Sequence, residues 1–432
     1  MTFSKTDFDE PNIVPASSIC VSIFDGTHDS PKQQDYGFKL VTSRHIKANK
    51  VLLEEAYFIN EEDYLKINKR SCLQIGDVLF TMIGTVGEVC RLYAEPDFAI
   101  KNIGVFRPKE PSDSFWIYYY LLSPEGRKNI EASKRGTTQQ FMGLKELREF
   151  PINFPKDSIY RRNQMRILEL LDAKIDANNA LSKTLEDIAQ TIFKSWFIDF
   201  DPVKAKMAGE KPAGMDAATA ALFPDSMEES ELGIVPSGWK VTKLSSSLKL
   251  HKSTVKAGAS TESVPYVPVD QIGAKDIFLK NSMPGSAAKT SLVSFRKNDI
   301  LFGAMRPYFH KVVLAPFDGT TRTTTFVLRV INSNYLSHSL FTVNQENAVA
   351  FATNNSQGTT IPYAVWNNSF EDFPMVLPPE PTAKAFNDLV LPIIEYGYSL
   401  IAQNRSLVEI RNGLLPRLIS GELQIPDEML AS

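Results

Sequence analysis

The sequence predicts an α+β protein in which two related domains of mixed strands and helices are joined by two long helices. Gly-Asp-Val-Leu-Phe at 76–80 recurs as Asn-Asp-Ile-Leu-Phe at 298–302, an offset of 222 in the numbering (298 − 76), and Gly-Thr-Thr at 136–138 recurs at 358–360 with the same offset. A long apolar pattern of helical period follows each copy. Because the period is so long, we expect two duplicated domains rather than a solenoid of short repeats, and 432 residues suffice for two or three domains with cores of their own.

The first domain is expected over residues 1–157. Short runs alternate apolar and polar residues between turn residues, which is typical of strands. A helix rich in Tyr and Trp is expected around 114–122. The block ends with Phe-Pro at 150–151, and this pair recurs at 373–374, near the end of the second copy.

The first long helix is expected over residues 158–200. Its apolar seam advances by alternating steps of three and four, as in a coiled coil, through Leu171, Lys174, Asn178, Leu181, Leu185, Ile188, Ile192 and Ser195. About 36 helical residues span roughly 54 Å, so we expect a partner helix along this length.

Residues 201–235 are rich in Ala, Gly, Pro and acidic residues and are expected to form a linker with little core. A second domain is expected over 236–380 and a second long helix over 381–425. Adding 222 to the first seam gives Ile393, Tyr396, Leu400, Gln403, Leu407, Ile410, Leu414 and Arg417. The two helices are therefore expected to pair with each other, although Pro392 and Gly397 argue against two straight, symmetric helices.

Composition is typical of a soluble globular protein, with 43% apolar and 22% charged residues. The formal net charge is −3. Residues 201–232 carry seven acids and three lysines, a net −4, so the remainder is near +1. Any contact with nucleic acid must then come from local basic patches. Because no apolar run reaches the roughly 18 residues of a membrane-spanning helix and no signal peptide is found, the expected location is cytoplasmic.

Enzyme motifs are missing from the sequence. It contains no phosphate-binding loop, no dinucleotide fingerprint and no His-Glu-x-x-His. The Asp/Asn-Pro-Pro-aromatic tetrapeptide of amino-methyltransferases is also missing. Asp77 with Glu88 resembles a nuclease pair only weakly, because the second copy places His310 where the first has Glu88. The five histidines and three cysteines lack metal-ligand spacing, so no cofactor and no metal are expected on this chain.

The chain resembles, over essentially its full length, the specificity subunit of type I restriction-modification systems. The resemblance rests on the order of several segments: Asp-Gly-Thr-His-Asp-Ser-Pro at 25–31, the two repeated motifs, Ile-Phe-Lys-Ser-Trp-Phe-Ile-Asp-Phe at 192–200 and Leu-Leu-Pro-Arg-Leu-Ile-Ser-Gly-Glu-Leu at 414–423. It implies two target-recognition domains on antiparallel helices, each reading one half of a split, asymmetric DNA site. It also implies no catalysis by this chain, two modification (methyltransferase) subunits and restriction subunits as partners, and S-adenosylmethionine, ATP and Mg on those partners.

Candidate DNA-contacting residues lie in polar, turn-rich stretches. Arginine pairs well with guanine and glutamine with adenine in the major groove. The candidates are Thr27, His28, Lys32, Arg135, Gln139 and Gln140 in the first domain, and Arg306, Lys311, Arg322 and Gln357 in the second. The Gly-Thr-Thr segments themselves have a second interpretation, a structural turn that both domains share.

Apolar side chains at the ends of the two long helices are candidates for partner binding, with burial in the core as the alternative. They are Trp196, Phe197, Phe200, Leu414, Leu415 and Leu418. Two other functions stay open at this point. One is a diverged, self-contained DNA methyltransferase or nuclease, and the other is a coiled-coil assembly scaffold that does not read DNA.

Overall fold

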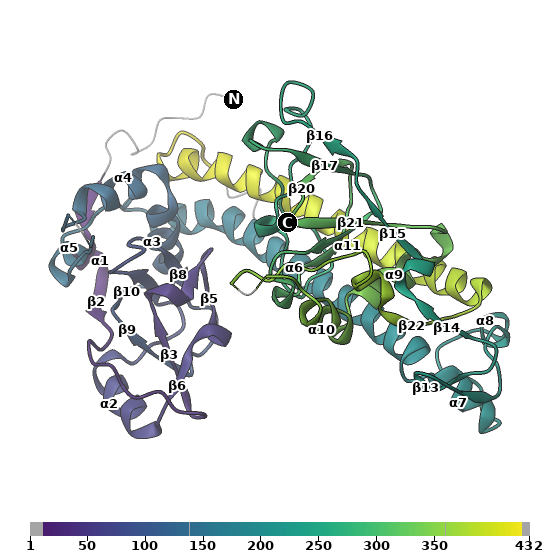
Figure 1. The fold of residues 1–432 in the computed structure, drawn as a ribbon. Helices are drawn as coiled ribbons and strands as arrows, with labels where there is room; N and C mark the ends of the chain where they lie inside the picture. Colours follow the sequence, from purple (N-terminus) through teal and green to yellow (C-terminus); the bar gives the residue numbers. More distant parts are fainter. Residues whose placement is uncertain (1–11, 138, 359, 426–432) are drawn as a thin grey trace, which may run out of the picture. The chain divides into compact units, whose positions relative to one another are not determined.

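A computed structural model describes residues 12–137, 139–358 and 360–425, and the chain divides into two compact units (Figure 1). Unit 1 comprises Met1–Ile175 with Ser406–Ser432, and unit 2 comprises Asp176–Arg405. Both units contain helices and sheets, and two helices of 40 residues each, α6 (Ser158–Phe197) and α11 (Glu380–Ile419), run through both. The predicted α+β class with two long helices is confirmed.

Each unit has a four-stranded antiparallel sheet of the same strand order. In unit 1 the order is β2-β10-β7-β8, with bounds Cys20–Asp25, Ile103–Pro108, Val78–Thr81 and Val89–Arg91. In unit 2 it is β15-β21-β18-β19, with bounds Leu248–His251, Thr325–Val330, Ile300–Gly303 and Val312–Leu314. The starts of β10 and β21 (325 − 103) and of β7 and β18 (300 − 78) both differ by the repeat offset of 222, so the sequence repeat is a repeat of this sheet.

The second sheet of each unit differs between the copies. In unit 1, β3 (Phe38–Thr42) pairs antiparallel with β6 (Tyr57–Ile59) and parallel with β9 (Phe98–Lys101). In unit 2, the corresponding sheet is wholly antiparallel and consists of β16 (Thr254–Val255), β17 (Leu292–Phe295) and β20 (Gly319–Arg322). The framework is therefore shared, whereas the segments before β7 and β18 have diverged.

Helices cover the sheets. Unit 1 has α2 (Glu61–Ser71), α3 (Asp113–Leu122), α4 (Pro124–Ser133) and α5 (Leu144–Arg148). Unit 2 has α9 (Leu336–Val343) and α10 (Glu346–Asn354). The start of α2 illustrates how sequence sets a boundary, because the Asn60 side chain accepts the Asp63 N–H at 2.7 Å and acidic residues fill the first turn.

Helices α6 and α11 run antiparallel within each unit. In unit 2, Asn178 donates to Gln403 at 2.6 Å, and the Phe193 and Phe386 ring centroids lie 6.0 Å apart. In unit 1, Arg411 binds Asp172 at 2.7 Å. Earlier residues of α6 thus meet later residues of α11. α11 is continuous through Pro392 and Gly397.

The predicted seam has the correct period but the wrong phase at every second position. Leu181 and Ile188 are exposed, while Ser182 and Ala189, one residue further on, are buried. In α11, Tyr396 and Ile410 are exposed in the same way. The reason is that, within each unit, α6 and α11 pack against the body of that unit as well as against each other. Small residues such as Ser182 and Ala189 are therefore buried while some apolar residues stay exposed.

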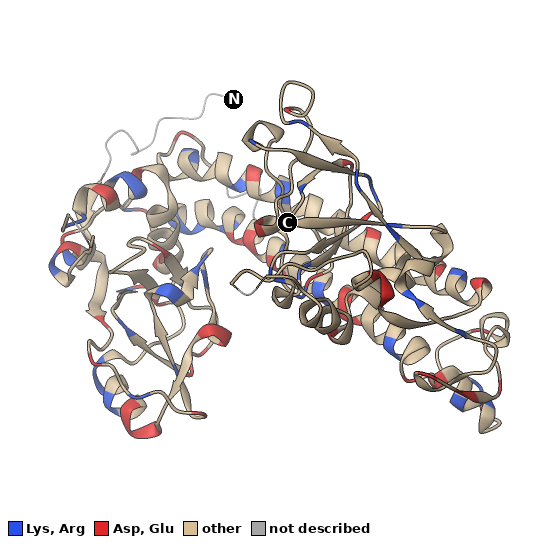
Figure 2. Ribbon diagram, viewed as in Figure 1, with Lys and Arg blue, Asp and Glu red and all other residues tan. Residues whose placement is uncertain are grey.

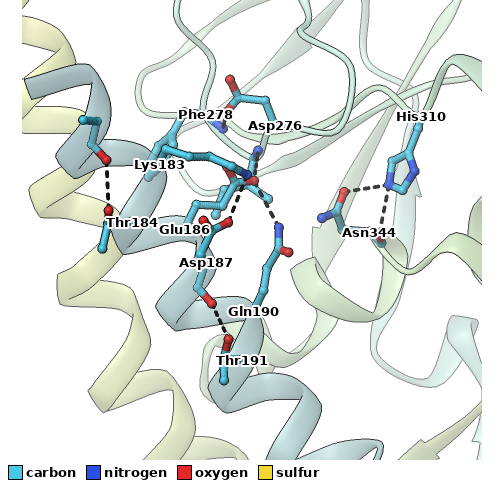
Figure 3. A network of polar contacts seen from close by, with 12 residues as sticks. Lys183, Thr184, Glu186, Asp187, Gln190, Thr191, Asp276, Phe278, His310 and Asn344 are labelled. Atoms are coloured by element: carbon cyan, nitrogen blue, oxygen red, sulfur yellow. Dashed lines mark hydrogen bonds and ion pairs between the residues drawn. The ribbon is translucent and has the colours of Figure 1, made fainter. Parts of the chain in front are cut away.

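A polar network attaches α6 to the body of unit 2 (Figure 3). The buried Glu186 carboxylate accepts the Ile277 N–H at 3.0 Å and lies 3.1 Å from the Lys183 ammonium, which also lies 3.0 Å from Asp187. Burial raises the pKa of Glu186. Because the Glu186 carboxylate accepts a hydrogen bond from the Ile277 N–H, it fixes the position of the loop around Ile277 relative to α6.

The expected linker at 201–235 has more structure and more core than predicted. It contains α7 (Asp201–Met207), α8 (Ala217–Ala221) and a hairpin of β12 (Met227–Ser230) and β13 (Gly233–Pro236). Val203, Phe223 and Val235 are buried. Sparse apolar residues in an acidic segment are therefore sufficient to dock it onto unit 2.

Candidate nucleic-acid interface

The Gly-Thr-Thr segments form the same closed turn in both units. Arg135 and Phe141 exchange two backbone hydrogen bonds of 2.9 Å, and Gln357 and Tyr363 exchange two of 2.9 and 2.8 Å. Gly136 and Gly358 both have left-handed φ, at 86° and 89°. A Cβ on Gly136 would lie 2.4 Å from the Gln139 carbonyl oxygen, so glycine is required there. The structural interpretation holds for these glycines, and Thr138 and Thr359 lie outside the described residues.

A hairpin loop lies beside each turn. Isolated β-bridges pair Ile83 with Phe141 in unit 1 and Met305 with Tyr363 in unit 2. Met305 lies 222 residues after Ile83, and Tyr363 lies 222 residues after Phe141, so the two bridges are equivalent. The loops connect β7 to β8 and β18 to β19. Each unit thus brings together one hairpin loop and one closed turn on an equivalent part of its framework.

In unit 1 these loops line a polar concavity. Gln139 lies there with Thr85, Arg44, Lys101 and Asn102, and no carboxylate is among its lining residues. Two cations, amides and hydroxyls without an acid favour an anionic or hydrogen-bonding ligand. Of the candidates, Gln139 is therefore placed where contact with nucleic acid is chemically reasonable.

The other candidates from the same turn are exposed. Arg135 forms an ion pair with Glu146 at 2.6 Å, although more than half of its side chain remains exposed. Gln140 is exposed next to it. Both side chains are accessible, but only Gln140 is free of a described carboxylate partner.

The Thr27 to Lys32 segment is tied to the edge of the same concavity. His28 lies 2.8 Å from the Asn102 amide oxygen and 3.0 Å from the buried Asp25 carboxylate. The Thr27 hydroxyl accepts the Asp29 N–H at 3.1 Å, so it stabilises the turn locally. Lys32 is exposed further along the same segment.

In unit 2 the candidates divide into accessible and engaged residues. Arg322 and Gln357 are exposed, and Arg306 is half-buried with its N–H donated to the Pro362 carbonyl at 2.8 Å. The prediction that Lys311 contacts DNA is corrected, because its ammonium donates to the Val269 carbonyl at 2.8 Å and burial lowers its pKa. Lys311 therefore stabilises the loop.

The concavity of unit 2 has a different chemistry. Gln357 and Lys252 line it together with apolar and aromatic side chains such as Phe326, Tyr363 and Trp366. The closed turn thus adjoins a polar concavity in unit 1 and a largely apolar one in unit 2. Figure 2 shows cationic and anionic residues interspersed over both units, so contact with DNA has to be local.

Two buried ion pairs were not predicted. Arg107 binds Asp77 through two hydrogen bonds of 2.8 and 2.7 Å, and Arg329 binds Asp299 through two of 2.7 and 2.6 Å. The hydrogen bonds raise the pKa of both guanidinium groups. The signal was in the sequence, because the two Asp and the two Arg are each separated by the repeat offset. Asp77 is thus a structural carboxylate.

The predicted partner-binding residues are largely buried within the chain, which corrects that prediction. Trp196, Phe197 and Phe200 belong to the core of unit 2, where Trp196 packs on Phe223 with ring centroids 5.1 Å apart. Leu415 and Leu418 belong to the core of unit 1, and Leu414 is partly buried against it. Apolar residues at these helix ends therefore complete the core of the unit in which they lie.

In residues 12–137, 139–358 and 360–425, no group of three His, Cys, Asp or Glu side chains has a metal-binding arrangement. No described helix has the length and apolarity to cross a membrane.

Several known proteins are similar to this chain in sequence. Residues 21–189 match the family model described as the type I restriction modification DNA specificity domain. The type I restriction enzyme MjaIX specificity subunit of Methanocaldococcus jannaschii is 23% identical over 363 residues, covering 82% of this chain and 78% of the relative. The HindI specificity subunit of Haemophilus influenzae is 23% identical over 413 residues, covering 82% of this chain and 88% of the relative. Over most of its length the chain is therefore similar to specificity subunits of type I restriction enzymes.

A solved member of this family has the same fold. The S subunit of a type I restriction-modification system from M. genitalium matches with a TM-score of 0.54 at 14% identity, covering 94% of this chain and 95% of that one. The fold expected of the family is therefore present at very low sequence identity.

Proposed function

We propose that this chain is the sequence-reading subunit of a type I restriction-modification complex, in which each unit reads one half of a bipartite, asymmetric DNA site. The observation that carries the proposal is the paired arrangement of hairpin loop and closed turn, repeated at the same offset on equivalent strands. The framework is the same while the loop side chains differ, so the two half-sites should differ in sequence.

Catalysis is assigned to partners. Two modification subunits would carry S-adenosylmethionine and methylate adenine, and restriction subunits with ATP and Mg would translocate and cleave DNA. Similarity to specificity subunits supports a non-catalytic role for this chain.

The proposed partner surface includes apolar side chains left exposed on the long helices. Leu181 and Ile188 on α6, and Leu389 and Tyr396 on α11, are each seven residues apart and so lie on one face of their helix. Leu181→Ala with Ile188→Ala should leave thermal unfolding of the chain nearly unchanged and weaken its co-purification with the modification subunit. Ile198→Ala, at a similarly exposed residue just after α6, is the control. Unchanged co-purification would remove these residues from the partner surface.

The central experiment is to co-express the chain with its methyltransferase partner and map methylated adenines across a host genome. A split, asymmetric motif that disappears when this chain is deleted is the expected result. Methylation that is indifferent to the deletion would contradict the proposal.

A paired variant locates the reading loops. Gln139→Ala with Gln140→Ala should relax base preference in one half of the motif and leave the other half intact. Gln74→Ala is the matched control, since this exposed glutamine precedes β7 whereas the reading loop follows it. Relaxation of both halves, or of neither, would exclude this turn as a half-site reader.

Salt dependence separates DNA reading from a scaffold role. Phosphate contacts release counterions, so the affinity of the complex for DNA should fall steeply between 50 and 200 mM salt, by orders of magnitude as for other DNA-binding proteins, roughly 10³-fold for six phosphate contacts. Affinity that is weak and independent of both salt and sequence would favour the scaffold.

A further inference from the structure

Two aromatic side chains stand out at the tip of the β18–β19 loop. Tyr308 is 50% exposed and Phe309 is 47% exposed, and their ring centroids lie 4.8 Å apart. They form most of a short 3-10 turn, Pro307–Phe309. Exposed aromatic residues that touch one another often mark a contact site.

The backbone on both sides of this pair is held in an unusual conformation. Arg306 and His310 both have left-handed φ, at 52° and 51°. For residues other than glycine this conformation costs free energy, and it persists only where the surroundings impose it. The contact between the Tyr308 and Phe309 rings does not explain why the backbone at Arg306 and His310 is strained.

Hydrogen bonds fix both ends of the loop. On one side, Arg306 donates its N–H to the Pro362 carbonyl at 2.8 Å. On the other, His310 Nε2 lies 2.9 Å from the backbone carbonyl oxygen of Asn344 and 3.0 Å from its amide oxygen (Figure 3). The rings are therefore presented on a rigid support, which lowers the entropy lost on binding.

The equivalent loop of unit 1 is built differently. The strand pairs that close the two loops show that the loop of unit 2 is longer by a single residue. Counted from these pairs, Arg306 corresponds to Gly84 and His310 to Gly87, and both glycines adopt left-handed φ without the penalty. Between these glycines stand only a threonine and a valine. The aromatic pair is thus specific to one of the two units.

The surroundings favour a polyanion as the occupant. Residues 303–311 contain Arg306 and no acidic residue, and the adjoining segment 354–363 contains no acidic residue either. Glu346 of α10 interacts electrostatically with His310, and its carboxylate is paired with the Lys275 ammonium at 2.9 Å. Gln357, in that segment, is exposed and suited to base edges. A protein partner bound by apolar contact alone would not need an arginine and an exposed glutamine beside the rings.

We infer that Tyr308 and Phe309 form a rigid aromatic wedge that inserts at one base step of the second half-site and unstacks it. The inference rests on the proposed function, since it needs unit 2 to be bound to its half-site. Apolar side chains inserted between base pairs unstack the step and kink the duplex. Aromatic rings can stack on any of the four bases, so this contact depends little on base sequence. The wedge would therefore add affinity and select deformable steps, while base identity is read by neighbouring polar groups.

The test uses the assembled methyltransferase complex and duplexes that carry its mapped site. 2-Aminopurine is placed at successive positions of the second half-site, leaving out the methylated adenine, and its fluorescence is recorded with and without complex. The wild-type complex should raise the fluorescence several-fold at one position. Tyr308→Ser with Phe309→Ser should abolish that rise and weaken binding by roughly ten- to a hundredfold. Tyr308→Phe, which keeps the ring, should retain the rise.

Controls separate the possible failures. Ile234→Ser, at a residue 58% exposed in β13, is the matched surface control and should change neither signal. Thermal unfolding of the double variant should equal that of wild type, which excludes misfolding. If the wild-type complex does not recognise a split site at all, the proposed function fails. If it does, and the double variant either retains the fluorescence rise or loses only its assembly with the methyltransferase, the wedge is overturned.

Discussion

Asp299 and Arg329 show how a single pair of residues supports each unit. The Asp299 side chain is almost fully buried, and besides both arginine hydrogen bonds it accepts the Arg296 N–H at 2.7 Å. Asp77 does the same in unit 1, where it accepts the Gln74 N–H at 2.8 Å. Each carboxylate therefore joins the start of the central strand to the neighbouring strand.

Removing the arginine should be costly, because a buried carboxylate is then left without its partner. Arg329→Met should lower the free energy of unfolding by about 3 kcal/mol, measured by urea denaturation. Lys297→Met, which removes an exposed ion pair with Glu395 at 3.4 Å, is the control and should have little effect. Equal effects of the two substitutions would mean that the pair contributes no more than a surface pair.

His338 should make unit 2 sensitive to acid. Its imidazole is buried beside Phe193 and Phe197, Nδ1 has no hydrogen-bond partner among the described residues, and burial lowers its pKa from 6.5 to about 3. Between these two values the unfolded chain binds a proton that the folded chain does not bind. Stability contributed by neutral His338 is therefore present above pH 6.5 and lost as the pH falls, by about 1.4 kcal/mol per pH unit.

The check is urea denaturation of wild type and His338→Leu at several pH values. Other titrating groups are shared, so the difference between the two proteins isolates His338. That difference should be constant above about pH 7.5 and should shift steadily in favour of the variant below pH 6.5. If the free energies of unfolding of the two proteins changed in parallel with pH, protonation of the His338 imidazole would not destabilise the folded protein.

Among the secondary-structure elements, helix α11 contains a glycine, Gly397, whose role cannot be inferred from the sequence alone. A glycine within a helix predicts weakness, yet a Cβ at Gly397 would lie 2.3 Å from the Phe278 ring. The glycine allows the helix to approach that ring closely. Gly413, in the same helix, has open space at its Cβ position.

The two glycines should therefore respond oppositely to alanine. Gly397→Ala should destabilise by about 1–3 kcal/mol through overpacking, whereas Gly413→Ala should stabilise by about 0.5–1 kcal/mol through helix propensity. Thermal unfolding of the two variants side by side checks this. Stabilisation by both would mean that Phe278 moves aside freely.

The sequence predicted those parts of the molecule that depend on local pattern and on the repeat. The central strands and both long helices follow from periodicity, and the turns at Gly136 and Gly358 follow from recurrence. The phase of the helix seam could not be predicted, because small residues such as Ala189 are buried by contacts from residues far away in the chain. For the same reason the sequence left Trp196 open between partner contact and core, and it placed Lys311 among the DNA contacts although its ammonium donates to the Val269 carbonyl.

At the scale of the whole molecule, independent reading by the two units predicts the result of an exchange. Replacing residues 1–157 by the corresponding domain of another family member should change one half of the methylated motif and leave the other half as it was. Genome-wide mapping of methylated adenine measures both halves at once. A change in both halves would show that the units do not read separately.

Unit 1 is assembled from both ends of the chain, and this has a consequence for its synthesis. Leu415, Leu418 and Ile419 are buried in the same core as Trp116 and Phe150. A ribosome makes Asp176–Arg405, the whole of unit 2, before it makes the last helical turns that unit 1 requires. The first 175 residues of unit 1 therefore wait for residues 415–419 to complete their core, and a nascent chain must keep them from aggregating until that part of α11 has been made.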